Sequence, residues 1–130
     1  MNDPFQTRGA FSWCELMTPD PEAAKRFYGP LFGWTLEDMD MGRGTYTVVK
    51  VGGAGIGGIM KRSPECAPDA PPHWGTYVTV EDVDATARKA EALGAKTLVP
   101  PTDIPKVGRF CMLQDHQGAV IAAITYVKEG

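Results

Sequence analysis

The sequence has no apolar run that approaches the roughly 20 residues of a membrane-spanning helix. It also has no excess of basic residues, because 13 Lys and Arg stand against 16 Asp and Glu, for a net charge of −3. This balance argues against a nucleic-acid partner and against anionic membrane surfaces. The segment MNDPFQTRGAF has no basic stretch followed by an apolar core, so no secretory signal is predicted.

Cysteine is scarce as well. The three cysteines, Cys14, Cys66 and Cys111, are far apart and form no CxxC pair, which predicts neither a zinc knuckle nor a dithiol redox site. Without an export signal, we expect a reduced, cytoplasmic protein. Cys14 and Cys111 fall in strand-like runs and are predicted to be small, buried apolar residues.

Two halves of the chain follow the same order of predicted elements: a strand, a helix and three strands. The first helix is predicted to begin after Asp20, a capping residue followed by proline, and to end at Gly33. Asp82 and Gly94 bound the second helix in the same way. At a constant offset of 62 residues, Asp82 aligns with Asp20.

The alternation of apolar and polar residues predicts seven further segments as strands, besides FSWCELM. These segments are WTLEDMD, GTYTVVKV, AGIGGIM, HWGTYVTV, KTLVPP, GRFCMLQD and AVIAAITYV. We therefore expect a single domain over 1–130, with one module over 8–60 and a second over 73–128. Residues 61–72, rich in proline, are predicted to be an extended linker between the modules.

Three segments carry a resemblance to a known family: ELMTPDPEAAKRFYGPLFGW, VEDVDATARKAEALGA and GRFCMLQDHQGAVIAAI. Together they resemble the vicinal oxygen chelate superfamily, which includes glyoxalase, bleomycin-resistance proteins and extradiol dioxygenases. The resemblance implies an α+β fold of two βαβββ modules, whose mixed sheet curves into a cup with the helices outside. It also implies a homodimer, because two chains pair in many members.

Glu15 is unusual because it shares a predicted strand face with Trp13 and Met17, where a lone carboxylate is costly. In the implied fold this face lines the cup, while Cys14 and Leu16 face the helix. Glu15 is then a candidate general base or hydrogen-bond partner for a ligand. The alternative is a strand carboxylate that pairs with a nearby Lys or Arg, or that faces water at a frayed edge.

The 62-residue offset places further residues on the facing half of the cup. Gly75, Tyr77 and Thr79 are expected to line it, with His73 at its rim. Trp74 is expected to add aromatic contact area. The candidate ligand-binding residues are Trp13, Glu15, Met17, His73, Tyr77, Thr79 and Ala122.

Metal-dependent members of the family place His or Gln on the first strand of each module and a carboxylate on a late strand. The resemblance aligns these positions with Trp13, Gly75, Ala122 and one of residues 57–60, none of which is such a ligand. A shift of two residues recovers His73 but neither carboxylate. We therefore predict no metal site and no cofactor, although a divalent metal is common in the family.

The segment VPPTDIPKVGR is predicted to be a connecting loop. Its position near the implied cup suggests a second interpretation, in which it closes over the cup as a lid. Lys106 or Arg109 would then meet an anionic ligand.

Three functions remain open from the sequence. The leading interpretation is a metal-free protein that binds a small organic molecule in the cup. The second is a glyoxalase-like lyase or isomerase that uses either a metal or Glu15 as a base. The third is a non-catalytic, dimeric structural module. Whether the protein is an enzyme is therefore left open, since function depends on the site and not on the scaffold.

Overall fold

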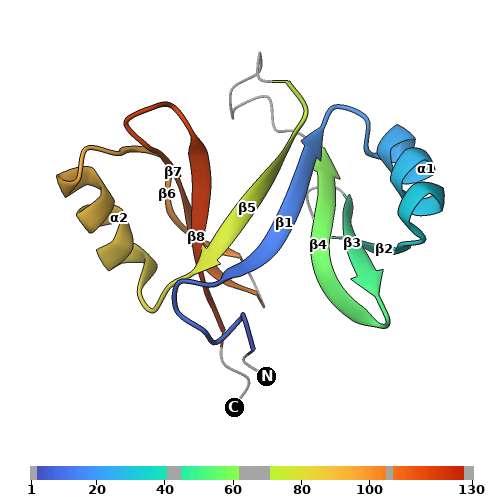
Figure 1. Ribbon diagram of the computed structural model, residues 1–130, viewed down its shortest axis with the longest axis horizontal. Coiled ribbons are helices and arrows are strands. Elements are labelled where there is room, and N and C mark those ends of the chain that lie inside the picture. The colour runs from blue at the N-terminus through green and yellow to red at the C-terminus, as the bar shows by residue number, and fades with distance from the viewer. Residues whose placement is uncertain (1–2, 41–44, 62–70, 105–106, 128–130) are drawn as a thin grey trace. The chain divides into compact units, whose positions relative to one another are not determined.

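A computed structural model describes residues 3–40, 45–61, 71–104 and 107–127 of the 130-residue chain (Figure 1). The contacts divide the chain into two compact units, Trp13–Gly75 and a second formed by 1–12 with 76–130. None of the described helices has both the length and the apolar character needed to cross a membrane.

The unit Trp13–Gly75 contains one helix and four paired strands. β1 (Phe11–Thr18) pairs in parallel with β4 (Ala54–Lys61), and β3 (Thr45–Val51) lies antiparallel between β4 and β2 (Thr35–Asp40). The helix α1 (Pro21–Phe32) connects β1 with β2. Leu16, Val49 and Ile59 form the buried core of this unit, against which side chains of α1 pack.

The ends of α1 follow the sequence prediction. The Asp20 side chain accepts a hydrogen bond from the Ala23 amide at 3.0 Å, and Pro21 occupies the first turn. Gly33 ends the helix in the left-handed region at φ 70°, where glycine carries no steric penalty. These two local signals fix where the helix starts and stops.

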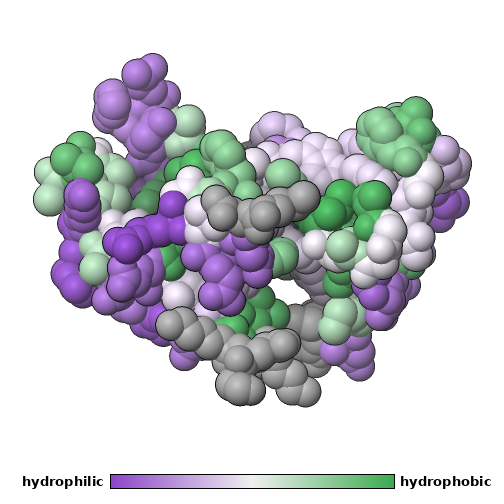
Figure 2. Space-filling view, turned by 60° about the horizontal axis from the view of Figure 1, so that its bottom comes forward, coloured by the Kyte–Doolittle hydropathy of each residue, from purple (hydrophilic) through white to green (hydrophobic). Residues whose placement is uncertain are grey.

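The outer side of α1 is apolar and open to solvent. Phe27, Leu31 and Phe32 are each more than half exposed, and no residue of α1 is fully buried. Figure 2 shows green, apolar surface on the α1 side of the molecule, at the right of the view. The helix therefore covers its sheet with one face and presents aromatic side chains with another.

The second unit repeats this arrangement. β5 (His73–Thr79) pairs in parallel with β8 (Val120–Tyr126), and β7 (Gly108–Gln114) lies antiparallel between β8 and β6 (Lys96–Ile104). The helix α2 (Val83–Ala92) begins after Asp82, whose side chain accepts from the Ala85 amide. The core consists of Val83, Ala87, Cys111, Leu113 and Ala123.

The order strand, helix and three strands thus occurs twice, with one parallel and two antiparallel pairings each time. The predicted α+β fold of two βαβββ modules is confirmed. Most of the predicted linker lies outside the described residues. The predicted module boundaries stay predictions.

The strand predicted at KTLVPP is present, and it runs on to Ile104, so the overlapping prediction of a loop at VPPTDIPKVGR is wrong for its first part. β6 continues through Pro100 and Pro101 to Ile104. Proline cannot donate to a ladder, but the pairing of β6 with β7 shifts register between Val99 and Thr102. This irregularity accommodates both prolines within the strand. Lys106 lies outside the described residues.

The two described cysteines differ. Cys111 is fully buried, as predicted, whereas the prediction that Cys14 is buried is wrong. Cys14 is in register with Gly57 of β4, which has no side chain to cover the thiol. Strand alternation correctly placed Cys14 on the same face as Leu16. It could not show that the facing residue, Gly57, leaves the Cys14 thiol exposed to solvent.

We expect alkylation to separate these two thiols. Iodoacetamide at pH 8 should modify Cys14 in the folded protein and leave Cys111 unmodified, because burial raises the pKa of the Cys111 thiol and blocks access. Peptide mass spectrometry after timed labelling measures both, and unfolding in urea should make them equally reactive. Labelling of Cys111 in native buffer at the rate of Cys14 would contradict this packing.

Candidate functional site

A chain of three hydrogen-bonded side chains lies in the unit Trp13–Gly75. The indole Nε1 of Trp13 donates to the hydroxyl of Tyr46 at 2.9 Å. The Tyr46 hydroxyl in turn donates to Oε2 of Glu15 at 2.7 Å. Only 8% of Glu15 is exposed, so this carboxylate is buried and held by a specific donor.

The chemistry of the three groups fixes the direction of these hydrogen bonds. An indole N–H can only donate, so the Tyr46 oxygen must accept from Trp13. The single proton of the Tyr46 hydroxyl is then directed to Glu15. Oε2 of Glu15 therefore accepts this hydrogen bond. A hydrogen bond donated to a carboxylate oxygen favours the ionised form of the group.

Gly58 makes room for this arrangement. Gly58 lies in register with Glu15 on β1 and with Val48 on β3. A Cβ atom at this position would lie 1.9 Å from the Tyr46 hydroxyl oxygen, far inside contact distance. The phenol of Tyr46 thus occupies the space that a side chain of residue 58 would fill.

The strand neighbours of Glu15 that share its face are mainly apolar among the residues that the structure describes. Met17 is in register with Met60, and Met60 with Tyr46, so these side chains share the face of Glu15. Val48 lies on the same face, and all of these neighbours are only partly buried. The core residues occupy the opposite, α1 side. An apolar surface with a few convergent polar groups is the usual character of a small-molecule site.

Two further residues of this unit were expected near the ligand. His73 is partly buried, and its Nδ1 lies 3.0 Å from the carbonyl oxygen of Pro71. Trp74 packs edge to face against Tyr28 of α1 and donates to its hydroxyl at 3.3 Å. Trp74 therefore faces α1, and its predicted place among the cup aromatics is wrong because strand alternation turns it away from His73.

The remaining predicted residues lie in the second unit. Tyr77 is buried, pairs with Ala122 across the strands and approaches the ring of Phe110, with centroids 6.2 Å apart. The Thr79 hydroxyl donates to the Pro4 carbonyl at 2.7 Å and anchors the N-terminal segment. A role of Tyr77, Thr79 and Ala122 in ligand binding stays a prediction.

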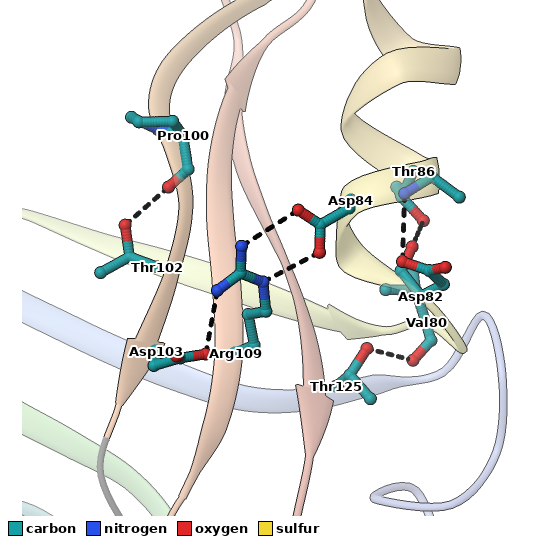
Figure 3. Close-up of polar contacts among 10 residues, drawn as sticks. Val80, Asp82, Asp84, Thr86, Pro100, Thr102, Asp103, Arg109 and Thr125 are labelled. Carbon is teal, nitrogen blue, oxygen red and sulfur yellow. Dashed lines mark hydrogen bonds and ion pairs between the residues drawn. The ribbon is translucent and has the colours of Figure 1, made fainter.

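Arg109, which was expected to meet an anionic ligand if the loop closed as a lid, is engaged in ion pairs. Its guanidinium binds both carboxylate oxygens of Asp84 on α2 at 2.9 and 3.0 Å, and Asp103 on β6 at 3.0 Å (Figure 3). These bonds lower the pKa of Asp84. A groove of about 960 Å³ lies beside this cluster and also contains the Arg8–Glu81 ion pair. Because these charges satisfy one another, the groove presents less binding chemistry than the Glu15 site does.

The residues do not fit the metal centre of metal-dependent family members. Trp13 occupies the first-strand position, and the late-strand position falls at one of residues 57–60, none of which is a carboxylate. At two of these positions a side chain would also collide with its neighbours: a Cβ at residue 57 would lie 2.3 Å from the Cys14 carbonyl oxygen, and one at residue 58 would lie 1.9 Å from the Tyr46 hydroxyl. Within the described ranges, no three His, Cys, Asp or Glu side chains gather as metal ligands.

Tyr46 is the site residue that the sequence reasoning missed. Two signals were present in the sequence. Residues 45–49 alternate so that Tyr46 and Val48 share a face, and two glycines stand in the middle of the neighbouring strand. Glycine inside a strand often marks the close approach of another group, which here is the Tyr46 phenol.

The chain matches the model of the Glyoxalase/Bleomycin resistance protein/Dioxygenase superfamily over residues 10–123. It is 42% identical over 117 residues to the "Putative glyoxylase CFP32" of Mycobacterium tuberculosis, covering 89% of this chain and 44% of that protein. It is 30% identical over 126 residues to the "Anthracycline biosynthesis protein DnrV" of Streptomyces peucetius, covering 88% of this chain and 46% of that one. The chain thus spans less than half the length of these relatives.

Solved structures show the same fold. The methylmalonyl-CoA epimerase of Mycobacterium tuberculosis superposes with a TM-score of 0.69 at 14% identity, covering 95% of this chain and 92% of that one. The hypothetical protein BH1468 of Bacillus halodurans superposes with a TM-score of 0.71 at 9% identity, covering 95% and 99%. Together with the repeated βαβββ order, the match over residues 10–123 shows that this chain belongs to the Glyoxalase/Bleomycin resistance protein/Dioxygenase superfamily.

Proposed function

We propose that the protein binds a small organic molecule on the face of the Trp13–Gly75 unit that carries Glu15, and that it needs no metal to do so. The observation that carries the proposal is the buried Glu15 carboxylate, held by Tyr46 within a face of partly buried apolar side chains. A buried carboxylate is costly unless it is hydrogen-bonded, so its retention on an apolar face is consistent with a functional role. A ligand that covers this face would gain apolar contact and a charged hydrogen-bond acceptor.

The relatives support an organic ligand in general terms. One is named for glyoxylase activity and another for anthracycline biosynthesis, and both names concern small organic molecules. The ring of Trp13 and the flexible side chains of Met17 and Met60 provide a surface suited to a flat, apolar molecule.

The proposal predicts a localised effect of ligands on the tryptophans. In a metabolite and drug library followed by ¹H–¹⁵N spectra, ligands should move the indole resonance of Trp13 and leave that of Trp34, on the α1 side, in place. Glu15→Gln should raise the dissociation constant of such a ligand roughly tenfold, because a charged acceptor is lost.

The matched control is Glu22→Gln, since Glu22 is an exposed carboxylate on α1 that pairs with Lys25. It should leave ligand affinity unchanged. A broad library that never perturbs Trp13 would sink the proposal. Stoichiometric zinc, nickel, iron or manganese that survives dialysis would overturn its metal-free part.

A second candidate function is proton abstraction by Glu15 in an isomerase or lyase. The buried carboxylate in an apolar setting favours it, because general bases are found in such places. If a bound ligand has an acidic C–H bond, the protein should catalyse exchange of that hydrogen with D₂O. Glu15→Gln should lower the exchange rate by about 10²-fold or more. Equal exchange in the variant would rule out this base.

We also propose that the chain acts as a homodimer. Two chains pair in many members of the superfamily to which this chain belongs. Sedimentation velocity at micromolar concentration should give twice the mass of 14.0 kDa. A single monomeric species over the whole concentration range would contradict it.

A further inference from the structure

We infer that residues 3–10 form a strap that occupies a second ligand site, on the face of the second unit opposite α2. The ligand class is a small, neutral molecule with an aromatic ring beside an amide carbonyl. Such a molecule takes the place of the strap when it binds. The site is separate from the face that carries Glu15, so the inference goes beyond the proposed function and the two fail independently.

The face opposite α2 is the second unit's counterpart of the Glu15 face. Thr79 is in register with Ile124, and both side chains lie on this face, away from the core residue Ala123. Only 5% of Thr79 and 3% of Ile124 are exposed. In the first unit, Met17 corresponds to Thr79 at the 62-residue offset and is only partly buried. The end of the face that is partly open in one unit is therefore covered in the other.

The strap contacts this face through a carbonyl group and a ring. The Thr79 hydroxyl donates to the Pro4 carbonyl at 2.7 Å. The Phe5 ring packs edge to face against Tyr126, with centroids 4.9 Å apart and ring planes at 83°. Tyr126 lies two residues after Ile124 on β8 and therefore shares its face. A ligand that carries a carbonyl acceptor beside an aromatic ring can make the same two contacts.

The strap lies on the surface and is held lightly. None of residues 3–10 is fully buried, and the segment runs beside the end of β5 (Figure 1). The Gly9 amide donates to the Thr79 carbonyl at 2.8 Å. The ion pair between Arg8 and Glu81 is exposed and therefore contributes little. Surface segments with few buried side chains open at a low cost in free energy, so a ligand can displace the strap.

Gly9 is the hinge of the strap. Its φ of 87° lies in the left-handed region, which residues with a side chain adopt at a cost. A Cβ at this position would meet no atom within 4 Å. Gly9→Ala therefore strains the closed strap without a clash and leaves Phe5 and Thr79 in place. Because a closed strap lowers the apparent affinity for a ligand by the fraction of open molecules, this strain should raise that affinity.

Two small amides test the site on the whole 130-residue chain. N-acetyl-L-phenylalaninamide joins a carbonyl to an aromatic residue through one amide bond, as Pro4 joins Phe5, and N-acetyl-L-alaninamide lacks the ring. Each is titrated into ¹⁵N-labelled protein, with affinity taken from the amide resonance of Thr79. We expect Gly9→Ala to bind the phenylalanine amide with a roughly millimolar dissociation constant, about fivefold tighter than the unchanged protein. The alanine amide should bind neither protein.

The matched control is Gly94→Ala. Gly94, after α2, also has a positive φ, of 98°, and open space around its built Cβ. This variant carries the same kind of backbone strain outside the strap and should bind the phenylalanine amide as the unchanged protein does. Hydrogen exchange of the Thr79 amide, which donates to the Ala10 carbonyl, measures opening directly. It should be faster in Gly9→Ala than in Gly94→Ala.

Phe5→Ala provides a second route if Gly9→Ala folds poorly. It removes the ring that competes with the ligand and should tighten binding of the phenylalanine amide by about tenfold. Equal affinity in the unchanged protein and in both strap variants would overturn the competition. Absence of binding in all of them would overturn the second site and leave the Glu15 face, which is followed at Trp13, untouched. Equal binding of the alanine amide would overturn the aromatic ligand class.

Discussion

Gly57→Ala is expected to lower the free energy of unfolding by about 3 kcal/mol, a large loss for the addition of a single methyl group. Gly57 is buried on β4 and in register with Cys14 on β1. Its added Cβ would lie 2.3 Å from the Cys14 carbonyl oxygen, which belongs to the backbone and cannot rotate away. The strands must separate, and their parallel ladder weakens.

Urea denaturation and thermal melting measure this effect. A loss of this size should lower the melting temperature by roughly 10 °C for a domain of this length. Gly55→Ala on the same strand meets only ordinary contacts and should change stability by less than about 0.5 kcal/mol. Equal melting temperatures for the two variants would show that β1 and β4 do not approach as closely as described.

The secondary structure of this chain could be predicted because its signals are local. Asp20 and Asp82 each accept a hydrogen bond from an amide three residues later, as capping residues do. Gly33 supplies the left-handed residue that ends the first helix. The end of β6 was predicted less well: the strand predicted at KTLVPP continues to Ile104, and this extension depends on non-local pairing with β7.

The candidate site could be predicted only in part. Strand alternation placed Trp13, Glu15 and Met17 on one face, away from Leu16, which lies in the core on the α1 side. The partner of Glu15 could not be predicted, because Tyr46 comes from a strand 31 residues away in sequence. The contact requires the register of β1, β4 and β3 together, and no single segment encodes that register.

The same register offers a physical reason for the missing metal-site carboxylate. The Cys14 carbonyl blocks a side chain at residue 57, and the Tyr46 phenol fills the space at residue 58. A carboxylate at residue 58 would displace Tyr46 from Glu15. The hydrogen-bonded chain and a metal ligand at residue 58 are therefore mutually exclusive.

Tyr46→Phe is expected to lower the free energy of unfolding by about 1.5–3 kcal/mol, because it removes the donor to a buried carboxylate. The change also deprives the Trp13 indole of its acceptor. The volume and the aromatic ring stay the same, so the loss reports the hydroxyl alone. Urea denaturation of both proteins at pH 7 measures it.

A double-mutant cycle with Glu15→Met shows whether the loss arises at the carboxylate. In the Glu15→Met background, Tyr46→Phe should cost only about 0.5–1.5 kcal/mol, the value of the neutral hydrogen bond with Trp13. The difference between the two backgrounds is the coupling between the Tyr46 hydroxyl and Glu15. A coupling near zero would mean that the phenol does not hold the carboxylate in solution, and the acceptor on which ligand binding is argued would lose its support.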